Sequence, residues 1–270
     1  MMRSYLMSKQ ILSVEIAPDL LQIKSMRYYL NKWQPDFVSI SNLSRFSFDN
    51  ITQCASYIQK ALNIPVVIHL TGISHNKREI DESLKILRQN NISNLLLLRG
   101  DKHGHIKNYF PYANELVKYV KSKNDKFKIM GACYPEVHPE AQSLIEDIQH
   151  LKTKVNAGCT QLISQMFFDN QKYYQFIKET NKQNIKVPIL AGIMPITEMQ
   201  TVNWLKKIKM DIPQFIQNNN DLKQAGIKFT IEQINDLYKN NVDGIHLYTM
   251  NNWSATDEII KNIKRSELNE

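Results

Sequence analysis

The feature of this sequence that most restricts its fold is a short strand-like apolar run that recurs eight times. Between these runs lie stretches with apolar residues at helical spacing, such as Leu144, Ile148 and Leu151. The eight predicted strands are ILSVEI 11–16, DFVSIS 36–41, PVVIHLT 65–71, NLLLLRG 94–100, KIMGACY 128–134, QLISQMF 161–167, VPILAGIM 187–194 and GIHLYTM 244–250. Alternation of strand and helix over 270 residues is typical of a (β/α)8 barrel, in which parallel strands close into a cylinder.

The alternative α/β architecture is a doubly wound parallel sheet. No G-x-G-x-x-G motif follows any predicted strand, which removes the main support for a dinucleotide-binding fold of that kind. We therefore predict a single (β/α)8 TIM barrel as one catalytic domain over residues 1–270, with 1–10 and 266–270 as flexible tails. The connection 210–230 is predicted to hold a short helix and a polar turn at 218–220, and 254–265 a closing helix.

Charge and hydropathy limit the partners that this chain is expected to bind. The 34 basic and 26 acidic residues give a formal charge of +8, but the lysines are scattered and no basic run is interleaved with aromatic residues. Nucleic acid is therefore not expected, whereas a weak attraction for anionic small molecules is. No window approaches eighteen apolar residues and the N-terminus has no apolar signal core, so we expect neither membrane insertion nor secretion.

The cysteines and histidines provide no metal or disulfide pattern. Cys54, Cys133 and Cys159 are odd in number and form no C-x-x-C pair, which argues against a disulfide framework and a zinc site and favours a cytoplasmic location. His103 and His105 form an H-x-H array without a third ligand, so no metal is predicted. Nucleophilic acyl transfer has little support, because the chain has no G-x-S-x-G elbow.

Polar residues stand at the ends of all eight predicted strands. In a barrel of this class the loops after the strands converge on one mouth, where the chemistry takes place. The residues at these ends are Glu15, Ser41, Asn42, His69, Thr71, Arg99, Asp101, Tyr134, Glu136, His138, Gln165, Pro195, Thr197, Tyr248 and Asn251. Any one of them is more often structural, since loops are solvated, but the eight ends together favour a ligand site. His246, within an apolar run, is interpreted as a hydrogen-bonded core histidine.

The run NLLLLRGD 94–101 places charge directly after a core strand. An arginine at such a position is costly to bury unless an anion meets it, so Arg99 predicts an anionic ligand. A second signal follows YPEVHPEA 134–141, where Pro139 suits the first position of a helix and His138 its entrance.

The helix predicted after this motif carries Asp147, His150 and Lys154 at spacings of three and four. An ordinary solvated helix face is the competing interpretation of this polar stripe. Together with Arg99, however, a lysine and a helix N-terminus at one edge of the barrel suit a cofactor that contains a diphosphate.

Six segments together resemble the catalytic barrel of bacterial-type 5,10-methylenetetrahydrofolate reductases. They are PDFVSIS 35–41, IHLT 68–71, LLLLRGD 95–101, YPEVHPEA 134–141, LKTKVNAGCTQLISQMFFD 151–169 and GIMPIT 192–197. They occur in the order of the family, and the resemblance extends from about Ser13 to Asn252. It implies an FAD enzyme that takes hydride from NADH or NADPH and reduces 5,10-methylenetetrahydrofolate to 5-methyltetrahydrofolate.

The resemblance also implies roles for individual residues. Glu15 matches the acid that helps to open the folate ring, Asp101 a carboxylate near flavin and pterin, and Gln165 a residue that hydrogen-bonds folate. Tyr248 is grouped with the substrate-binding residues, and Ser41 stands where a threonine is usual at the flavin and nicotinamide site. The FAD-contacting positions are His69, Arg99, Gly100, Asp101, Tyr112, Ala113, Tyr134, His138, Ala141, Asp147, His150 and Lys154, with His150 in place of the usual asparagine. Ring opening needs an acid, so Glu15 is expected to have a raised pKa in a site closed by flavin and folate.

The sequence departs from the family at a few positions. The loop EIAPDL 15–20 keeps only Pro18 of two aromatic residues and two prolines, and Asn252 replaces an arginine on the folate side. Two alternatives to a reductase follow: a catalytically weakened flavin-binding barrel that serves as a partner subunit or sensor, and a flavin-free pterin-binding methyltransferase barrel. Retention of the acid, the carboxylate and the glutamine favours the reductase. The sequence leaves open NADH, NADPH or a reduced protein as donor, and is compatible with a homo-oligomer.

Overall fold

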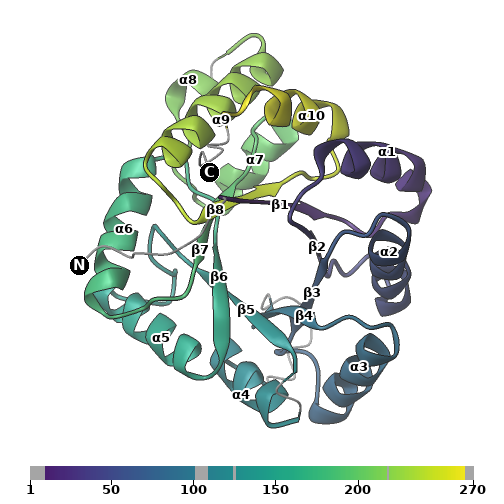
Figure 1. The fold of residues 1–270 in the computed structure, drawn as a ribbon. Coiled ribbons are helices and arrows are strands. Elements are labelled where there is room, and N and C mark those ends of the chain that lie inside the picture. The colour runs from purple at the N-terminus through teal and green to yellow at the C-terminus, as the bar shows by residue number, and fades with distance from the viewer. Residues whose placement is uncertain (1–9, 101–108, 124–125, 218, 265–270) are drawn as a thin grey trace, which may run out of the picture.

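Eight parallel strands close into a barrel in the order in which they occur along the chain (Figure 1). The computed structural model describes residues 10–100, 109–123, 126–217 and 219–264. The strands are β1 (Ile11–Ile16), β2 (Phe37–Ile40), β3 (Val66–Thr71), β4 (Asn94–Leu98), β5 (Lys128–Cys133), β6 (Cys159–Ser164), β7 (Ile189–Ile193) and β8 (Gly244–Tyr248). Each strand pairs with the next and β8 pairs with β1, so the predicted (β/α)8 barrel is confirmed.

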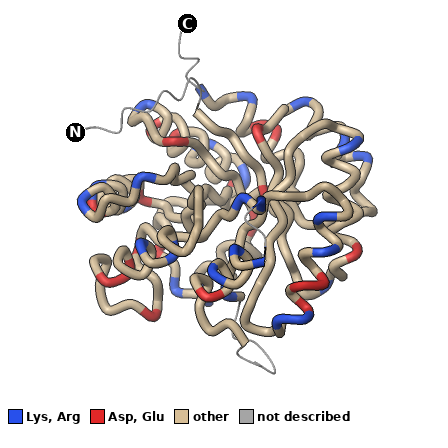
Figure 2. Tube along the Cα trace, turned by 60° about the horizontal axis from the view of Figure 1, so that its bottom comes forward, with Lys and Arg blue, Asp and Glu red and all other residues tan. Residues whose placement is uncertain are grey.

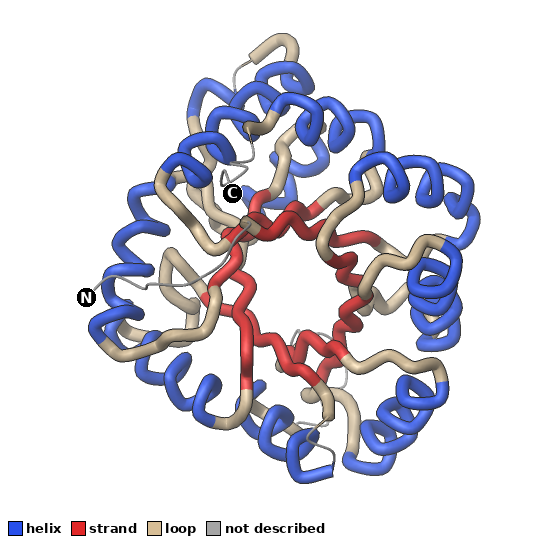
Figure 3. Tube along the Cα trace, in the orientation of Figure 1, coloured by secondary structure: helices blue, strands red, loops and turns tan. Residues whose placement is uncertain are grey.

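Helices form an outer ring around the strands (Figure 3). They are η1 (Leu20–Gln22), α1 (Ile23–Trp33), α2 (Phe48–Ala61), α3 (Lys77–Gln89), α4 (Ala113–Lys123), α5 (Leu144–Asn156), α6 (Asn170–Lys182), α7 (Met199–Lys207), α8 (Gln214–Gln217), α9 (Leu222–Lys239) and α10 (Trp253–Asn262). Local sequence determines where several of them begin. Ser47 with Asn50, and Asn76 with Glu79, form reciprocal capping boxes that satisfy the first backbone N–H groups of α2 and α3.

The interior of the barrel is divided into an apolar half and a polar half. Its apolar cluster consists of Phe37, Val67, Leu96, Met130, Ile163 and Leu190. Side chains alternate across a strand, so residues two positions further along face the same interior. On β1, β2, β3 and β8 these residues are polar: Ser13, Glu15, Ser39, His69 and His246. Polar groups in a core need partners, and two pairs form here, Ser13 with His246 and Ser39 with His69.

Two boundaries predicted from the sequence are wrong. Helix α5 begins at Leu144 and not at Pro139, because Ser143 is the residue whose side chain accepts from a first-turn N–H, that of Glu146. His138 therefore lies in the turn that precedes the helix. In the connection 210–230, the predicted short helix is confirmed as α8, but α9 already begins at Leu222, so that residues 222–230 are helical. The predicted closing helix is confirmed as α10.

Charged residues of both signs are interspersed along the outer helices (Figure 2). This arrangement fits solvated helix faces. Cys54, Cys133 and Cys159 are all buried and free, and burial raises the pKa of the Cys159 thiol to about 11. In the described part of the chain, no helix combines the length and the apolar character that crossing a membrane requires.

Candidate functional site

A cavity of about 1600 Å³ opens where the carboxyl ends of the strands meet. The described residues to which the family resemblance assigns a site role all line it: Glu15, Ser41, His69, Arg99, Gly100, Tyr112, Ala113, Tyr134, His138, Ala141, Asp147, His150, Lys154, Gln165 and Tyr248. Four of the predicted strand-end residues do not line it: Glu136, Pro195, Thr197 and Asn251. Asp101 lies outside the described residues, as do His103 and His105. Strands and loops that are far apart in the sequence thus bring the predicted residues to one place, while their individual roles stay predictions.

Glu15, near the end of β1, lies between two imidazoles. Its Oε2 atom is 3.6 Å from Nε2 of His69 and 3.7 Å from Nε2 of His246, and its side chain is only 20% exposed. Both distances exceed the range of a hydrogen bond. Burial raises the pKa of Glu15, but His69 and His246 together outweigh this effect, so that the pKa lies below its usual value. A raised pKa was expected for Glu15 in a site closed by flavin and folate. The protein groups alone shift this pKa in the opposite direction.

Burial also shifts the pKa values of His69 and Tyr248, which lie next to Glu15. The pKa of His69 is lowered, mainly by burial, although the Glu15 carboxylate opposes the shift. Burial also raises the pKa of Tyr248 well above its usual value, and the negative charge of Glu15 adds to this effect. The Tyr248 hydroxyl donates to the carbonyl of Ser164 at 2.8 Å. Near neutral pH, the protein groups here therefore favour a neutral His69, a neutral Tyr248 and an ionised Glu15.

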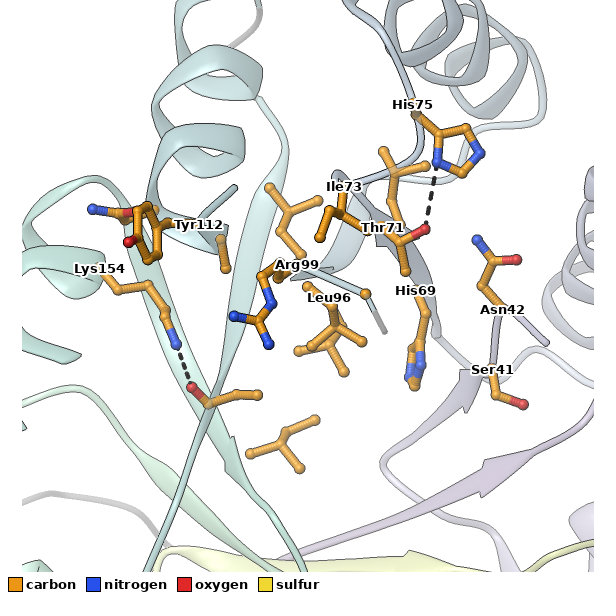
Figure 4. A pocket seen from close by; sticks show the side chains of 18 of the residues that line it. Ser41, Asn42, His69, Thr71, Ile73, His75, Leu96, Arg99, Tyr112 and Lys154 are labelled. Carbon is orange, nitrogen blue, oxygen red and sulfur yellow. Dashed lines mark hydrogen bonds between the residues drawn. The ribbon is translucent and has the colours of Figure 1, made fainter. Parts of the chain in front are cut away.

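Two basic side chains also line the cavity, Arg99 from the end of β4 and Lys154 from α5 (Figure 4). Arg99 forms an ion pair with Glu140 at 2.6 Å, and Lys154 donates to the carbonyl of Ala132 at 2.7 Å. Burial lowers the pKa of Lys154. A Cβ atom on Gly131 would lie 3.0 Å from Cδ of this lysine, so the glycine leaves room for the lysine stem.

The loop after β5 holds the imidazole of His138 in a fixed orientation. The rings of Tyr134 and His138 meet edge to face with their centroids 4.6 Å apart. Between them, Val137 has φ +73°, a left-handed conformation that strains a β-branched residue. The backbone N–H of His138 donates to Asp147, and its Nδ1 accepts from the N–H of Glu140. Neutral His138 therefore carries its proton on Nε2.

Two glycines are required by the site geometry. Gly100 has φ +89°, and a Cβ there would lie 3.1 Å from Cβ of Thr71. At Gly192, a Cβ would lie 2.0 Å from the carbonyl oxygen of Ser164 and 2.9 Å from the Tyr248 ring. The absence of a side chain at position 192 thus allows Tyr248 to lie across β6 and β7.

Sequence reasoning placed His246 in the core and did not connect it with Glu15. The structure confirms that this histidine is buried and hydrogen-bonded, since Nδ1 lies 2.8 Å from Oγ of Ser13. The sequence does contain a signal, because polar residues two apart occur in both strands, Ser13 with Glu15 and His246 with Tyr248. Only the closure of β8 against β1 turns these two patterns into one cluster.

Asn251 and Asn252, which follow β8, have structural contacts. The Asn251 side chain accepts from the N–H of Ala17 at 2.9 Å and donates to its carbonyl, so that it holds the altered loop after Glu15. Asn252 caps α10 by accepting from the N–H of Ala255. Asn252, at the position where the family resemblance implies an arginine, therefore serves helix α10.

A closed (β/α)8 barrel with an acid, imidazoles and two basic side chains in one cavity defines a barrel protein whose mouth is suited to an anionic small molecule. Within this class, the chain belongs to the methylenetetrahydrofolate reductase family, whose sequence profile, described as "Methylenetetrahydrofolate reductase", matches residues 12–264. It is 30% identical over 266 residues to "5,10-methylenetetrahydrofolate reductase" of Buchnera aphidicola subsp. Baizongia pistaciae, covering 93% of this chain and 90% of that protein.

A plant relative is longer than this chain. "Methylenetetrahydrofolate reductase (NADH) 1" of Arabidopsis thaliana is 30% identical over 260 residues, which cover 87% of this chain but only 44% of the plant protein. Among solved structures, an uncharacterized protein from Clostridium thermocellum, described as binding two copies of 5-methyl-5,6,7,8-tetrahydrofolic acid, superposes with a TM-score of 0.69. The match covers 94% of both chains at 16% identity, and it shows a shared fold. Names of curated relatives specify NADH in some cases and NADPH in others.

Proposed function

We propose that this chain is an FAD-dependent methylenetetrahydrofolate reductase, which takes hydride from NADH or NADPH and converts 5,10-methylenetetrahydrofolate into 5-methyltetrahydrofolate. The observation that carries the proposal is the convergence of Glu15, Gln165 and Tyr248 with two cationic side chains on one cavity, in a chain of this family. The names of the relatives and the folate bound by the Clostridium protein support the choice of substrate.

The residues of the cavity fit an FAD molecule. Its volume of about 1600 Å³ exceeds the roughly 300–1,000 Å³ of an ordinary small-molecule pocket, so a dinucleotide and a second ring system have room. Leu96, Leu98 and Ile163 provide an apolar wall for a flat ring. Arg99 and Lys154 would hold the diphosphate. When bound, the flavin accepts hydride from the nicotinamide and passes it to the folate.

Gln165 and Tyr248 retain the hydrogen-bonding capacity needed to orient a pterin. The Gln165 Oε1 atom accepts from the N–H of Met166, which leaves the amide NH₂ free to donate into the cavity. The Tyr248 hydroxyl donates to the Ser164 carbonyl, which leaves its oxygen able to accept. A ring with both donors and acceptors along its edge matches this pair.

Glu15 is the residue that would deliver a proton to the folate ring nitrogen. In the structure, the two imidazoles favour its carboxylate form, so a bound folate must raise its pKa before it can act as an acid. A folate that excludes water from the cavity does this, because desolvation disfavours the charged form. The Glu15 carboxyl group is thus protonated when folate is bound, which is the state in which it must act as an acid.

Anaerobic stopped-flow spectroscopy of the purified protein tests the proposal. We expect a yellow protein whose flavin is bleached by NADH or NADPH and then reoxidised by methylenetetrahydrofolate. A colourless protein that binds folate would contradict the proposal and support a methyltransferase barrel. A flavin that is reduced but not reoxidised by the folate would also contradict it, in favour of a sensor or partner subunit.

A further inference from the structure

The barrel interior behind Glu15 holds a histidine that the proposed chemistry leaves without a role. His246 has no exposed surface and is not among the residues that line the cavity, so a ligand there does not contact it. We propose that His246, supported by Ser13, is a positioning residue that partners the Glu15 carboxyl group in both of its protonation states and exchanges a proton with it. This inference rests on the proposed function and assigns to that site a residue beyond those that touch its ligands.

Strand register places the three side chains together. On the β1–β8 pair, Ser13 stands opposite His246, and Glu15 stands opposite Tyr248. Because side chains alternate across a strand, Ser13 and Glu15 point into the barrel one above the other, with the imidazole beside them. The cluster is therefore a consequence of barrel closure, which brings together residues separated by 233 positions.

The two ring nitrogens of His246 face different partners. Nδ1 lies 2.8 Å from Oγ of Ser13, while Nε2 is buried without a hydrogen-bond partner and lies 3.7 Å from Oε2 of Glu15. A buried polar atom without a partner is costly, and it points to a group that comes closer at another stage. Hydrogen bonds in active sites often tighten only in the complex with substrate, and a movement of less than 1 Å by the glutamate would close this one.

Ser13 makes both tautomers of the imidazole available. Its hydroxyl lies 3.2 Å from the carbonyl of Ile245 as well as 2.8 Å from Nδ1. When Glu15 is ionised, the hydroxyl donates to Nδ1 and the Nε2–H group faces the carboxylate. When Glu15 is protonated, the hydroxyl turns to Ile245, Nδ1–H donates to Oγ, and Nε2 accepts from the carboxylic acid. Neither state leaves Nδ1 without a partner.

His69 is a useful contrast, because it lacks this arrangement. Its Nε2 atom is shared between Oγ of Ser39 at 2.9 Å and Glu15 at 3.6 Å, so one nitrogen meets both neighbours. It also lines the cavity, where the family resemblance places the flavin. The titratable groups that face Glu15 are thus His69 on β3 and His246 and Tyr248 on β8, and of these only His246 presents opposite nitrogens to a serine and to the acid.

The proton balance of the step is simple. Glu15 gives its proton to the folate nitrogen and becomes a carboxylate. An imidazole of His246 that carries a proton on both nitrogens passes the proton on Nε2 to the Glu15 carboxylate and becomes neutral, with its remaining proton on Nδ1 donated to Ser13. The proton that is consumed is replaced from solvent through the cavity, on which Glu15 opens.

Infrared titration of the Glu15 carboxyl band, in the flavin-loaded protein as purified, tests the proposal without turnover. The band is identified by its loss in Glu15→Gln. In His246→Asn, which keeps a partner for Ser13 but none for Glu15, we expect the midpoint to rise by roughly one pH unit, because one of two groups that favour the carboxylate is lost. His75→Gln, at a histidine that lines the cavity but does not act on Glu15, is the control and leaves the midpoint unchanged.

Stopped-flow measurements on the same variants then identify the affected step. His246→Asn is expected to slow reoxidation of the flavin by folate at least about tenfold, because a general acid contributes about a hundredfold or more and His246 supports only part of that contribution. Flavin reduction by the nicotinamide should slow by less than about threefold, since it uses no acid. His246→Gln, which restores a partner for Glu15, recovers part of the loss. If His246→Asn does not fold, Ser13→Ala replaces it, with a smaller rise of the midpoint.

An unchanged Glu15 midpoint in the folded His246 variants would overturn the proposal, since His246 would then only fill space. A faster reoxidation would also overturn it, since His246 would then weaken Glu15 as an acid. Failure of the proposed function has a different signature. In that case Glu15→Gln itself reoxidises at the parental rate, while the shift of the carboxyl band in His246→Asn still reports whether the two residues are coupled.

Discussion

Two carboxylates of this protein are largely shielded from water and stand between two basic groups, Glu15 in the barrel mouth and Asp257 in the helical shell. They differ in how many hydrogen bonds they accept. Asp257 on α10 accepts from Lys32 on α1 at 2.8 Å, from Lys261 at 2.8 Å and from the Trp33 indole at 3.1 Å. Glu15 has its two imidazole nitrogens at 3.6 and 3.7 Å, beyond hydrogen-bond distance. Asp257 therefore accepts three hydrogen bonds, whereas Glu15 can still accept a hydrogen bond from each imidazole.

The electrostatic consequences differ in the same way. Burial raises the pKa of Asp257, but the bonds from Lys261, Lys32 and Trp33 lower it to about 2, far from any pH at which it could exchange protons usefully. At Glu15 burial opposes the two imidazoles, and neither imidazole nitrogen is within hydrogen-bond distance, so a ligand that excludes water adds to the effect of burial and raises the pKa. An acid between bases thus stabilises a fold when its hydrogen bonds are complete, and can take part in proton transfer when they are not.

Glu15→Gln is the substitution with the largest expected effect on activity. Reoxidation of reduced flavin by methylenetetrahydrofolate should fall at least about a hundredfold, the lower size of a lost general acid, while reduction by nicotinamide stays within about tenfold. Stopped-flow measurement of both half-reactions provides the check. Equal slowing of both would mean that Glu15 holds the flavin and does not donate a proton.

If neither half-reaction slows, the acid lies elsewhere, and Asp19 in the same loop is the next residue to test. The structure argues against that outcome. The Asp19 carboxylate already accepts from the N–H of Leu21 at 3.1 Å and from the Gln22 amide at 2.9 Å, as the cap of η1.

Asp257→Asn should show the opposite pattern, with activity retained and stability lost. The amide keeps an acceptor for Trp33 but loses the charge that meets the two lysines. A shift of the pKa from 3.8 to about 2 corresponds to about 2 kcal/mol of folding free energy at neutral pH. Denaturant unfolding monitored by tryptophan fluorescence measures it. A stability equal to that of the parent would show that the three bonds only offset the burial of the carboxylate.

The contribution of Asp257 to stability depends on pH. Because the pKa of Asp257 is depressed in the folded state, its contribution is fully present above about pH 4 and is lost as the pH falls through about 2. We expect acid unfolding of the parent to include this loss, and Asp257→Asn to show a flatter curve over the same window. Parallel curves for the two proteins would contradict the assignment of the low pKa to Asp257.

Much of this architecture was predictable from local sequence patterns, because each strand repeats the same apolar signal. The boundaries of β1 were predicted to the residue, but β6 begins at Cys159, two residues before the predicted start, and ends at Ser164. The apolar residues after it, Met166 and Phe168, pack in a separate cluster with α7 and α8 and do not extend the strand. An apolar run alone does not show which neighbour it packs against.

The strand ends that line the cavity were predictable for a similar reason, since the barrel class fixes where its strands point. The contact of His246 with Glu15 was not, because it depends on which strand closes against β1. The start of α5 was missed because a proline signal at 139 competed with a serine cap at 143, and the hydrogen bond of the cap prevailed. Long-range pairing and competing caps are decided by three-dimensional packing.

The smallest expected loss of stability follows substitution of either lysine that contacts Asp257. Which of the two substitutions costs more shows whether the contacts of Asp257 connect two helices or stabilise α10 alone. Lys261 lies one turn from Asp257 on α10 and its side chain is 58% exposed, whereas Lys32 reaches from α1 and is 34% exposed. Exposed pairs contribute little because water and salt screen them. We therefore expect Lys261→Ala to destabilise less than Lys32→Ala, and both less than Asp257→Asn, since either single change leaves the carboxylate one lysine and the indole.

Unfolding midpoints at low and high salt measure this order, with Lys228→Ala as the control, because Lys228 lies 4.0 Å from Glu232 in a pair that is exposed on both sides. The loss in Lys32→Ala should persist at high salt, because this bond connects α1 to α10 and lies against the tryptophan pair Trp33 and Trp253, whose rings stack 5.8 Å apart. If Lys261→Ala proves the more damaging variant, the cluster stabilises α10 by itself, and the connection between the two helices depends on the stacked rings.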